Sequence, residues 1–374
     1  MLIYFTLLIL FFPFFFASAS LPSSPVLNVK IADKLKVVDI TGIDLERKIF
    51  FPEEKERVHS GRKTLRFNCH SHKNLSLDGS LLVASINSPT QVLTWNKNLY
   101  RGDFNLAVEK NKKGCSLIHR VSLENYISSL LAKEMNAVWP IESLKAQAIA
   151  ARTYAVIKMR ENESSEKPYH LLNSEIHQVT GHLLDETLRT VKAARETQGE
   201  VLVLKKNQQL APVFYSAKCG GKTHLAENIW GNRVPGQASV ICPYCHNHGK
   251  KKWESKVSIN EVRRIIKKTT EPNLTNIVFP PDNLTSEDLY YYSKGELKHI
   301  KKSSLRRHLG RKKIVSNNFS IIATDKKNIT LQGSGLGHGV GLCQLGALEM
   351  AKRGIKAEEI LSFYFPLHEI KKIY

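Results

Sequence analysis

The sequence predicts an α+β fold in which mixed strands surround an Ala-rich helical block and a basic insertion interrupts the chain. Short strand-like segments separated by turn residues occupy 61–121, a helical block follows at about 122–160, and strand-like segments return at 201–215 and 318–332. Strands and helices therefore form separate groups, which favours α+β over a regular βαβ alternation. The predicted divisions are a leader at 1–19, a β-rich region at 20–94, the first part of the main domain at 95–245, the basic insertion at 246–315 and the C-terminal part of the main domain at 316–374.

The first residues are typical of a secretory signal peptide. Leu2 to Phe16 is almost continuously apolar, and the small residues Ala17-Ser18-Ala19 follow. This pattern predicts cleavage after Ala19 and export to the periplasm or cell envelope. A basic residue ahead of the apolar run is missing, so an uncleaved membrane anchor is the alternative. The apolar run is shorter than a spanning helix needs, and Pro13 interrupts it.

The chain is strongly basic. It holds 55 Lys and Arg against 34 Asp and Glu, a formal net charge of +21, and much of the excess falls at Lys250–Lys252 and at 298–313. Such a balance predicts an anionic partner, which could be an acidic polymer, an acidic lipid surface or a nucleic acid. Export argues against nucleic acid. Membrane association and a merely solvated basic surface stay open.

A helix over 122–134 places a carboxyl among apolar residues. Ser122 is a candidate N-cap, and Glu134 shares a face with Ile127 and Leu131 because residues at i, i+4 and i+7 lie on one side of a helix. Burial and the negative end of the helix dipole both raise the pKa of such a carboxyl. A carboxyl that stays protonated near neutral pH suits a general acid. The alternative is that Glu134 reaches solvent or pairs with Arg152.

Two further segments are distinctive. The helix from Ile141 to about Arg160 is rich in alanine, which combines high helix propensity with small bulk. The segment 333–341 alternates glycine with other residues but lacks the spacing of a nucleotide-binding motif. Alternating glycines allow a ligand or another backbone to come close. His338 in this segment therefore either reaches a ligand or lies buried at a tight crossing of two chain segments.

Three motifs, in this order, resemble the stage II sporulation protein D family, the SpoIID/LytB domain. Segment 131–154 contains Leu-Ala-Lys-Glu-Met and the first part of the Ala-rich helix, and the motif ends in Arg-Thr-Tyr. Segment 216–223 is Ser-Ala-Lys-Cys-Gly-Gly-Lys-Thr, and segment 337–347 is Gly-His-Gly-Val-Gly-Leu-Cys-Gln-Leu-Gly-Ala. The resemblance covers about residues 95–370.

The resemblance implies a protein that acts on peptidoglycan. The sporulation members are lytic transglycosylases that cut MurNAc–GlcNAc β-1,4 bonds in glycan strands already stripped of peptides by an amidase, leaving 1,6-anhydro ends. Glu134 matches the family's catalytic residue, and catalysis requires no cofactor. A peptide-free strand carries lactyl carboxylates, which the basic segments could attract. The motif residues that we expect to bind substrate are His338, Gln344, Gly337, Gly339, Arg152 and Tyr154.

The LytB side of the family implies a second function, in which the chain binds glycan and stimulates an N-acetylmuramoyl-L-alanine amidase without cutting. Retention of Glu134 in the full motif favours the enzyme. Glu142 is expected to favour the dipole of its helix and to play little part in catalysis.

The cysteines allow a metal site or disulfides. Some family members bind zinc through His and Cys after the Ala-rich helix, but here His170 and His177 have no cysteines beside them, so we do not expect that site. Four other cysteines could form a structural zinc site, disulfides or a redox couple, and these alternatives stay open: Cys219, Cys242, Cys245 and Cys343.

Overall fold

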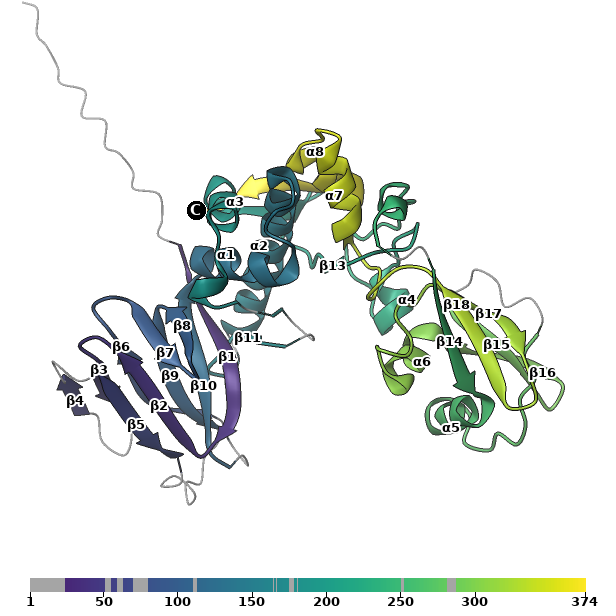
Figure 1. Ribbon diagram of the computed structural model, residues 1–374, viewed down its shortest axis with the longest axis horizontal. Helices are drawn as coiled ribbons and strands as arrows, with labels where there is room; N and C mark the ends of the chain where they lie inside the picture. The colour runs from purple at the N-terminus through teal and green to yellow at the C-terminus, as the bar shows by residue number, and fades with distance from the viewer. Residues whose placement is uncertain are drawn as a thin grey trace, which may run out of the picture.

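The computed structural model describes residues 24–50, 55–58, 63–69, 80–109, 113–163, 165, 167–174, 178–179, 181–249, 252–280 and 287–374. The predicted leader at 1–19, Lys250, Lys251 and His177 lie outside the described residues. Helices and strands both build the fold, which confirms the α+β class. Figure 1 shows N-terminal sheets on one side, a helical centre, and a second group of strands and helices on the other side.

The N-terminal part consists of two sheets. The larger has the strand order β11-β1-β10-β9-β6-β3-β4 and the smaller has β5-β2-β7-β8. Buried side chains from both sheets, such as Ile40 and Phe104, form one core, so the sheets pack face to face. The strands are β1 (Val26–Leu35), β2 (Val37–Gly42), β3 (Glu46–Ile49), β4 (Lys55–Val58), β5 (Thr64–Asn68), β6 (Ser80–Asn87), β7 (Val92–Trp95), β8 (Asn98–Arg101), β9 (Asp103–Glu109), β10 (Cys115–Ser122) and β11 (Leu171–Leu172).

Strands begin early in segment 24–50, inside the region 20–94 that the sequence predicted to be β-rich. β1 pairs antiparallel with β10 and parallel with β11, so it lies inside the larger sheet. Leu27 and Val29 are buried, one residue apart on the same face, as strand alternation requires.

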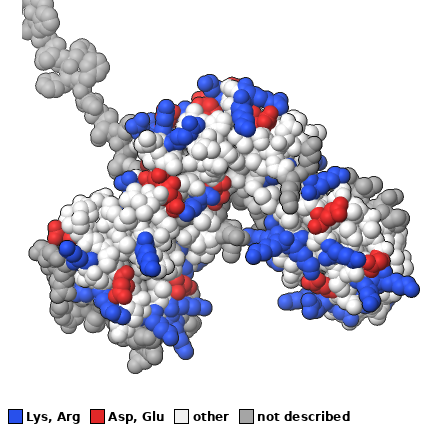
Figure 2. All heavy atoms as spheres, viewed as in Figure 1, with Lys and Arg blue, Asp and Glu red and all other residues white. Residues whose placement is uncertain are grey.

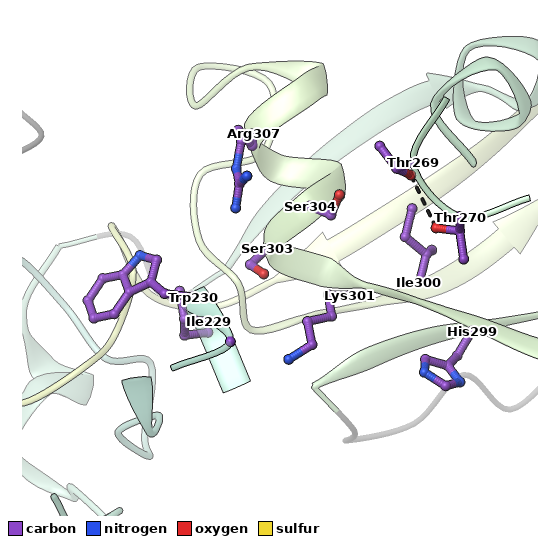
Figure 3. Close-up of a pocket in the computed structure, with 11 residues that line it drawn as sticks. Ile229, Trp230, Thr269, Thr270, His299, Ile300, Lys301, Ser303, Ser304 and Arg307 are labelled. Atoms are coloured by element: carbon purple, nitrogen blue, oxygen red, sulfur yellow. Dashed lines mark hydrogen bonds between the residues drawn. The ribbon is translucent and has the colours of Figure 1, made fainter. Parts of the chain in front are cut away.

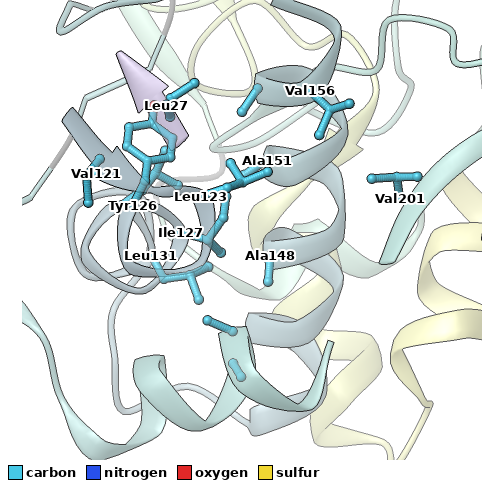
Figure 4. Packing of buried hydrophobic residues seen from close by; sticks show 14 of the residues in the cluster. Leu27, Val121, Leu123, Tyr126, Ile127, Leu131, Ala148, Ala151, Val156 and Val201 are labelled. Atoms are coloured by element: carbon cyan, nitrogen blue, oxygen red, sulfur yellow. The ribbon is translucent and has the colours of Figure 1, made fainter. Parts of the chain in front are cut away.

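Helices α1 (Leu123–Glu134), α2 (Ile141–Glu163) and α3 (Leu188–Glu196) form the centre. Ser122 caps α1, accepting a hydrogen bond from the N–H of Asn125 at 3.3 Å, as the sequence predicted. The alanines of α2 let it pack closely against its neighbours, and Figure 4 shows Ala148 and Ala151 facing the apolar side of α1. This packing fixes the end of α1 relative to the rest of the centre.

The chain's last segments return to the centre and cover α2 from the other side. Strand β20 (His368–Lys372) pairs antiparallel with β12 (Glu200–Leu204), and β19 (Leu342–Cys343) pairs parallel with β13 (Tyr215–Ser216). Helices α7 (Gln344–Lys352) and α8 (Ala357–Tyr364) share a buried core with α2. A strand at 212–215 was predicted, but regular pairing begins only at Tyr215.

The basic insertion has its own core. Strands β14, β18 and β17 form one sheet and β15 and β16 a hairpin, with buried residues such as Ile266, Leu305 and Leu331 between them and two helices. Because β14 pairs with β18, this body includes chain beyond residue 315. Its elements are β14 (Trp253–Ser258), α5 (Ile259–Thr269), β15 (Asp288–Ser293), β16 (Glu296–Lys301), α6 (Lys302–Leu309), β17 (Phe319–Thr324) and β18 (Asn328–Gly333).

Short elements join these parts, namely the one-turn 3₁₀ helices η2 (Leu183–Asp185) and η3 (Tyr244–Asn247) and helix α4 (Ala226–Trp230). Across the residues that the structure describes, no helix is both long and apolar enough to cross a membrane.

Candidate active site

Glu134 is the last residue of α1, where the helix meets the loop that leads to α2. The N–H of Met135 still bonds to the carbonyl of Leu131 at 3.0 Å, and Met135 itself is extended, so the helix ends there. Ile127 and Leu131, on the same face as Glu134, are fully buried. The helix thus presents the carboxyl at the edge of an apolar core, as the residue spacing predicted.

Burial raises the pKa of the Glu134 carboxyl above its ordinary value. Two neighbours oppose this by hydrogen bonding: the N–H of Val179, 3.4 Å from Oε1, and the side chain of Gln344. Among the described residues no Lys or Arg forms an ion pair with Glu134, and Arg152 pairs with Glu124 instead. Glu134 is therefore a half-buried carboxyl with polar neighbours but no cationic partner.

Two tyrosines, the buried Tyr126 and the partly buried Tyr215, lie near this carboxyl. Burial raises the pKa of Tyr126 and Tyr215 well above that of an exposed tyrosine, and the charge of Glu134 raises both further. The Tyr126 hydroxyl donates to Oε1 of Gln178 at 2.8 Å, and Nε2 of Gln178 donates to the carbonyl of Ala151 at 3.3 Å. Both hydroxyls stay protonated at neutral pH. The sequence analysis missed these residues because they belong to no motif and lie far apart in the chain.

Gln344 is the predicted site residue that the structure brings to Glu134. It is the first residue of α7, directly after β19, and only 5% of it is exposed. Its Nε2 lies 3.4 Å from Oε1 of Gln147, which belongs to the second turn of α2. The end of α1 and the start of α7 therefore meet at the Glu134 carboxyl, and Gln147 of α2 contacts Gln344.

The glycine segment is a crossing of two backbones. Gly341 has a φ of +74°, and a Cβ there would lie 2.0 Å from the carbonyl oxygen of Phe214. Gly339 has a φ of +76°, and its Cβ would lie 2.6 Å from the ring of His224. Gly337 runs beside Ser216 in the same way. The glycines therefore allow segments 214–224 and 335–341 to pack closely. In this structure Gly337 and Gly339 contribute to that packing.

His338 is held by its own loop. Its Nδ1 accepts a hydrogen bond from the N–H of Val340 at 3.0 Å, so the ring proton is on Nε2, which bonds to the backbone of Tyr215. Burial lowers its pKa to about 4, and the nearby charge of Arg306 lowers it too. The imidazole is neutral at physiological pH, with both nitrogens engaged. Only its ring face, 5.2 Å from that of Trp230 between centroids, is suited to contact a ligand.

Arg152 is not positioned to bind substrate. Its side chain is completely buried, and its Nε and Nη2 bond to the two carboxylate oxygens of Glu124 at 2.9 and 2.7 Å. Further bonds go to Thr197 and to the carbonyls of Ala194 and Glu200. The predicted substrate contact is wrong in this structure, because every direction of the guanidinium is used to join α1, α3 and β12.

A row of aromatic rings runs from Tyr154 toward the basic insertion. Tyr154, which is half-buried with its pKa raised to about 12 by burial, lies edge-on to Phe214 with 6.4 Å between ring centroids. Phe214 contacts Trp230 at 4.7 Å, and Trp230 contacts His338. Trp230 is 42% exposed. Aromatic faces of this kind pack well against the apolar faces of sugar rings.

Basic side chains adjoin this row. A pocket of about 280 Å³ lies between α4 and α6, with Trp230, Lys301 and Arg307 among the side chains that line it (Figure 3). Figure 2 shows Lys and Arg side chains gathered on the insertion where it borders the hollow between the two outer parts of the molecule. Arg306 and Arg311 lie close enough to His338 to lower its pKa. The aromatic row therefore ends on a positively charged surface.

Glu142 does not face this site. Its Oε2 accepts a hydrogen bond from the N–H of Ala357 at 3.0 Å, at the start of α8, and its Oε1 lies 3.3 Å from Nζ of Lys145. These partners lower the pKa of Glu142, although partial burial opposes them. Glu142 therefore links the start of α2 to the start of α8.

The cysteines fall into two groups. Cys69 and Cys115 form a disulfide that links the ends of β5 and β10, a pairing that the sequence analysis did not single out. The other four cysteines are buried, and their sulfurs all lie within 4.8 Å of one another: Cys219, Cys242, Cys245 and Cys343. His170, which we did not expect to bind zinc, accepts a hydrogen bond from the N–H of Asn28 at 3.0 Å.

Several known proteins resemble this chain in sequence. Residues 111–204, which include Glu134 and the Ala-rich helix, match the family model described as "Stage II sporulation protein". The chain is 33% identical over 253 residues to an uncharacterized protein of Brachyspira hyodysenteriae, which covers 67% of this chain and 66% of that protein. It is 29% identical over 264 residues to stage II sporulation protein D of Bacillus subtilis, covering 66% of this chain and 74% of that protein.

A match of 24% identity over 289 residues links the chain to the amidase enhancer of Bacillus subtilis, of which it spans 39%. The chain therefore spans between about two fifths and three quarters of these relatives. With its three motifs in the same order, the chain belongs to the stage II sporulation protein D family, the SpoIID/LytB family.

Proposed function

We propose that this protein is an exported peptidoglycan lytic transglycosylase that cleaves MurNAc–GlcNAc β-1,4 bonds in peptide-free glycan strands. Membership of the stage II sporulation protein D family supports a role at the cell wall. The observation that carries the finer proposal is Glu134, a carboxyl whose pKa is raised by burial and which has no cationic partner among the described residues. Such a group keeps its proton to higher pH than an exposed carboxyl does, which suits a proton donor.

The reaction needs one proton donor that later becomes a proton acceptor. Protonated Glu134 gives its proton to the glycosidic oxygen as the bond to the MurNAc anomeric carbon breaks, so GlcNAc leaves with a new hydroxyl. The substrate's own N-acetyl group can stabilise the oxocarbenium-like centre, so no second carboxylate is required. The Glu134 carboxylate then takes the proton of the MurNAc 6-hydroxyl as that oxygen bonds to the anomeric carbon. The product is a 1,6-anhydro end, and Glu134 regains its proton.

Gln344, Tyr126 and Tyr215 surround Glu134 with polar groups that suit a carboxyl that loses and regains a proton. The carboxylate formed after the first step receives hydrogen bonds from Gln344 and from the Val179 N–H, which limit its cost in a half-buried site. Tyr126 and Tyr215, kept protonated by their raised pKa values, add hydroxyl dipoles nearby. This role for Gln344 is positioning and electrostatic.

The surface beside the site suits an anionic sugar polymer. Trp230 and the ring face of His338 offer aromatic faces, and Lys301 and Arg307 lie on the adjoining pocket. A strand without peptides exposes the lactyl carboxylate of each MurNAc, which matches this charge. This match favours a substrate made by an amidase. Export to the periplasm or cell envelope is part of the proposal.

A second function has specific support. One relative is named amidase enhancer, so the chain could bind glycan and stimulate an N-acetylmuramoyl-L-alanine amidase without cutting. The two functions differ in what happens when no amidase is present. An enhancer leaves purified glycan intact, whereas the enzyme shortens it.

The experiment compares three substrates in the absence of an amidase: intact peptidoglycan, amidase-treated glycan strands, and chito-oligosaccharides that lack lactyl groups. We expect the purified protein to shorten the amidase-treated strands, as measured by chromatography of the released fragments. Intact peptidoglycan should be cut slowly or not at all. If the protein cuts nothing alone but raises the rate of an added amidase, the enhancer function replaces the proposal.

A further inference from the structure

Four cysteines far apart in the sequence converge in the core that α2 shares with α7 and α8. Cys219 follows β13, Cys242 and Cys245 flank the start of η3, and Cys343 ends β19. Each is at most 2% exposed. Four sulfurs brought together from three chain segments and shielded from solvent form a ready set of ligands for a soft metal ion.

The spacing of the sulfurs fits one metal ion. For a tetrahedral zinc ion with Zn–S bonds of about 2.3 Å, the sulfurs lie about 3.8 Å apart. Here the sulfurs of Cys219 and Cys245 are 3.6 Å apart, and all four lie within 4.8 Å of one another. Two disulfides would instead need sulfurs in two pairs at about 2.05 Å. The four sulfurs form one set around a common centre.

Two backbone N–H groups and one hydroxyl, all able to donate hydrogen bonds, surround the sulfurs. The N–H of Cys219 points to Sγ of Cys343 at 3.3 Å, and the N–H of Gly346 points to the same sulfur at 3.4 Å. The hydroxyl of Tyr364 lies 3.1 Å from Sγ of Cys242. Donors aimed at sulfur stabilise negative charge on it. Metal-bound thiolates carry that charge, whereas the sulfurs of a disulfide do not.

The packing leaves no space to spare beside these donors. A Cβ on Gly346 would lie 1.9 Å from the Tyr364 hydroxyl and 3.0 Å from Sγ of Cys242. Glycine at this position therefore lets α7 begin directly against the cysteines, which is where the donors are needed. The residues around the four sulfurs are therefore tightly packed, as the sulfurs themselves are.

We propose that Cys219, Cys242, Cys245 and Cys343 bind one structural zinc ion as four thiolates. The ion would join the segment after β13, the turn η3 and the start of α7. Because Gln344 directly follows Cys343, zinc would also hold Gln344 in place beside Glu134. The site is separate from the disulfide of Cys69 and Cys115, which stabilises the N-terminal sheets.

The test measures the metal in the purified full chain, independently of glycan cleavage. After gel filtration in a chelator-treated buffer, elemental analysis should find one zinc ion per chain. Cys245→Ser and Cys343→Ser should each lower zinc content at least severalfold. His246→Ala is the matched control, because His246 lies in the same turn as Cys245, is exposed, and offers no sulfur; this variant should keep its zinc.

If the serine variants fail to fold, cobalt exchange into the unmodified protein decides the matter. Cobalt held by four thiolates gives intense visible absorption and strong sulfur-to-metal charge transfer, and we expect both. Failure of the reduced protein to bind zinc or cobalt would overturn the proposal. Peptide mapping that finds a disulfide among the four cysteines, or elemental analysis that finds iron in place of zinc, would also overturn it. None of these readouts depends on the transglycosylase activity, so the two proposals can fail separately.

Discussion

Burial raises the pKa of the Glu134 carboxyl, whereas hydrogen bonds from Val179 and Gln344 lower it, and the net effect makes stability depend on pH. Burial raises its pKa above the ordinary value, so between that value and the raised one the folded protein binds more protons than the unfolded chain. Stability from this group is therefore fully present in acid and is lost as pH rises through the raised pKa. Glutamine at this position keeps the size and the polar contacts but never ionises.

Glu134→Gln is accordingly expected to leave stability unchanged at low pH and to equal or exceed the wild type at pH 7. Thermal melts of both proteins across this pH range measure the difference. A variant that is clearly less stable at pH 7 would mean that the carboxylate form is stabilised in the fold, which contradicts the raised pKa.

Residues whose position follows from local spacing were the easiest to predict. The spacing of Glu134 with Ile127 and Leu131 placed it at the edge of the core from local periodicity alone. Gln178 and Tyr215 were missed because only tertiary packing brings them to α1, and no local pattern carries that information. Arg152 was misassigned for the same reason, since its partner Glu124 lies one helix earlier.

At the scale of elements, Arg152 joins α1, α3 and β12 through a completely buried guanidinium. Arg152→Met should destabilise the protein by about 3–5 kcal/mol, because it leaves Glu124 without its cationic partner in a mostly buried position. Denaturant unfolding measures the change. The double variant with Glu124→Gln should recover part of the loss. Arg160→Met, on the exposed end of the same helix, is the control and should cost little.

The close contact between the glycine segment and the backbone just before β13 predicts how two glycine variants differ in stability. Gly341→Ala puts a methyl group 2.0 Å from the Phe214 carbonyl, whereas Gly354→Ala meets nothing within 4 Å, although both residues have positive φ. Both variants should lose on the order of 1 kcal/mol from backbone strain. Gly341→Ala should lose substantially more, as measured by urea unfolding. Equal losses would show that the two backbones are not in close contact.

The elements themselves were predictable to different degrees. A helix over 122–134 was expected from its cap at Ser122, and a helix from Ile141 to about Arg160 was expected from the high helix propensity of its alanines. The pairing of β19 with β13, and of β20 with β12, could not be predicted, because strands of two to five residues carry little periodic signal. The same pairings decide where Gln344 and Cys343 lie.

On the scale of the whole molecule, a net charge of +21 should make association with an anionic polymer sensitive to salt. Binding of peptide-free glycan strands should weaken severalfold between low and high ionic strength, while binding of neutral chito-oligosaccharides should change little. Fluorescence anisotropy with labelled strands measures both.

The basic surface beside Trp230 should account for much of this effect. The double variant with Lys301→Glu and Arg307→Glu changes two exposed residues of the pocket between α4 and α6 and should reduce the salt dependence. Lys371→Glu and Lys372→Glu, exposed on β20 of the centre, are the matched control. Equal effects of the two pairs would place the glycan elsewhere on the protein.

The most direct test of the proposed function is end-group analysis by mass spectrometry of amidase-treated glycan strands after incubation with the purified protein. We expect 1,6-anhydro-MurNAc ends with the wild type and with Glu142→Gln, whose carboxyl serves only helix packing. Glu134→Gln should keep glycan binding and lose turnover by a factor of about 10²–10⁴, the usual contribution of one acid–base group. Full activity of a well-folded Glu134→Gln protein, or ends that are hydrolysed instead of anhydro, would contradict the proposed mechanism.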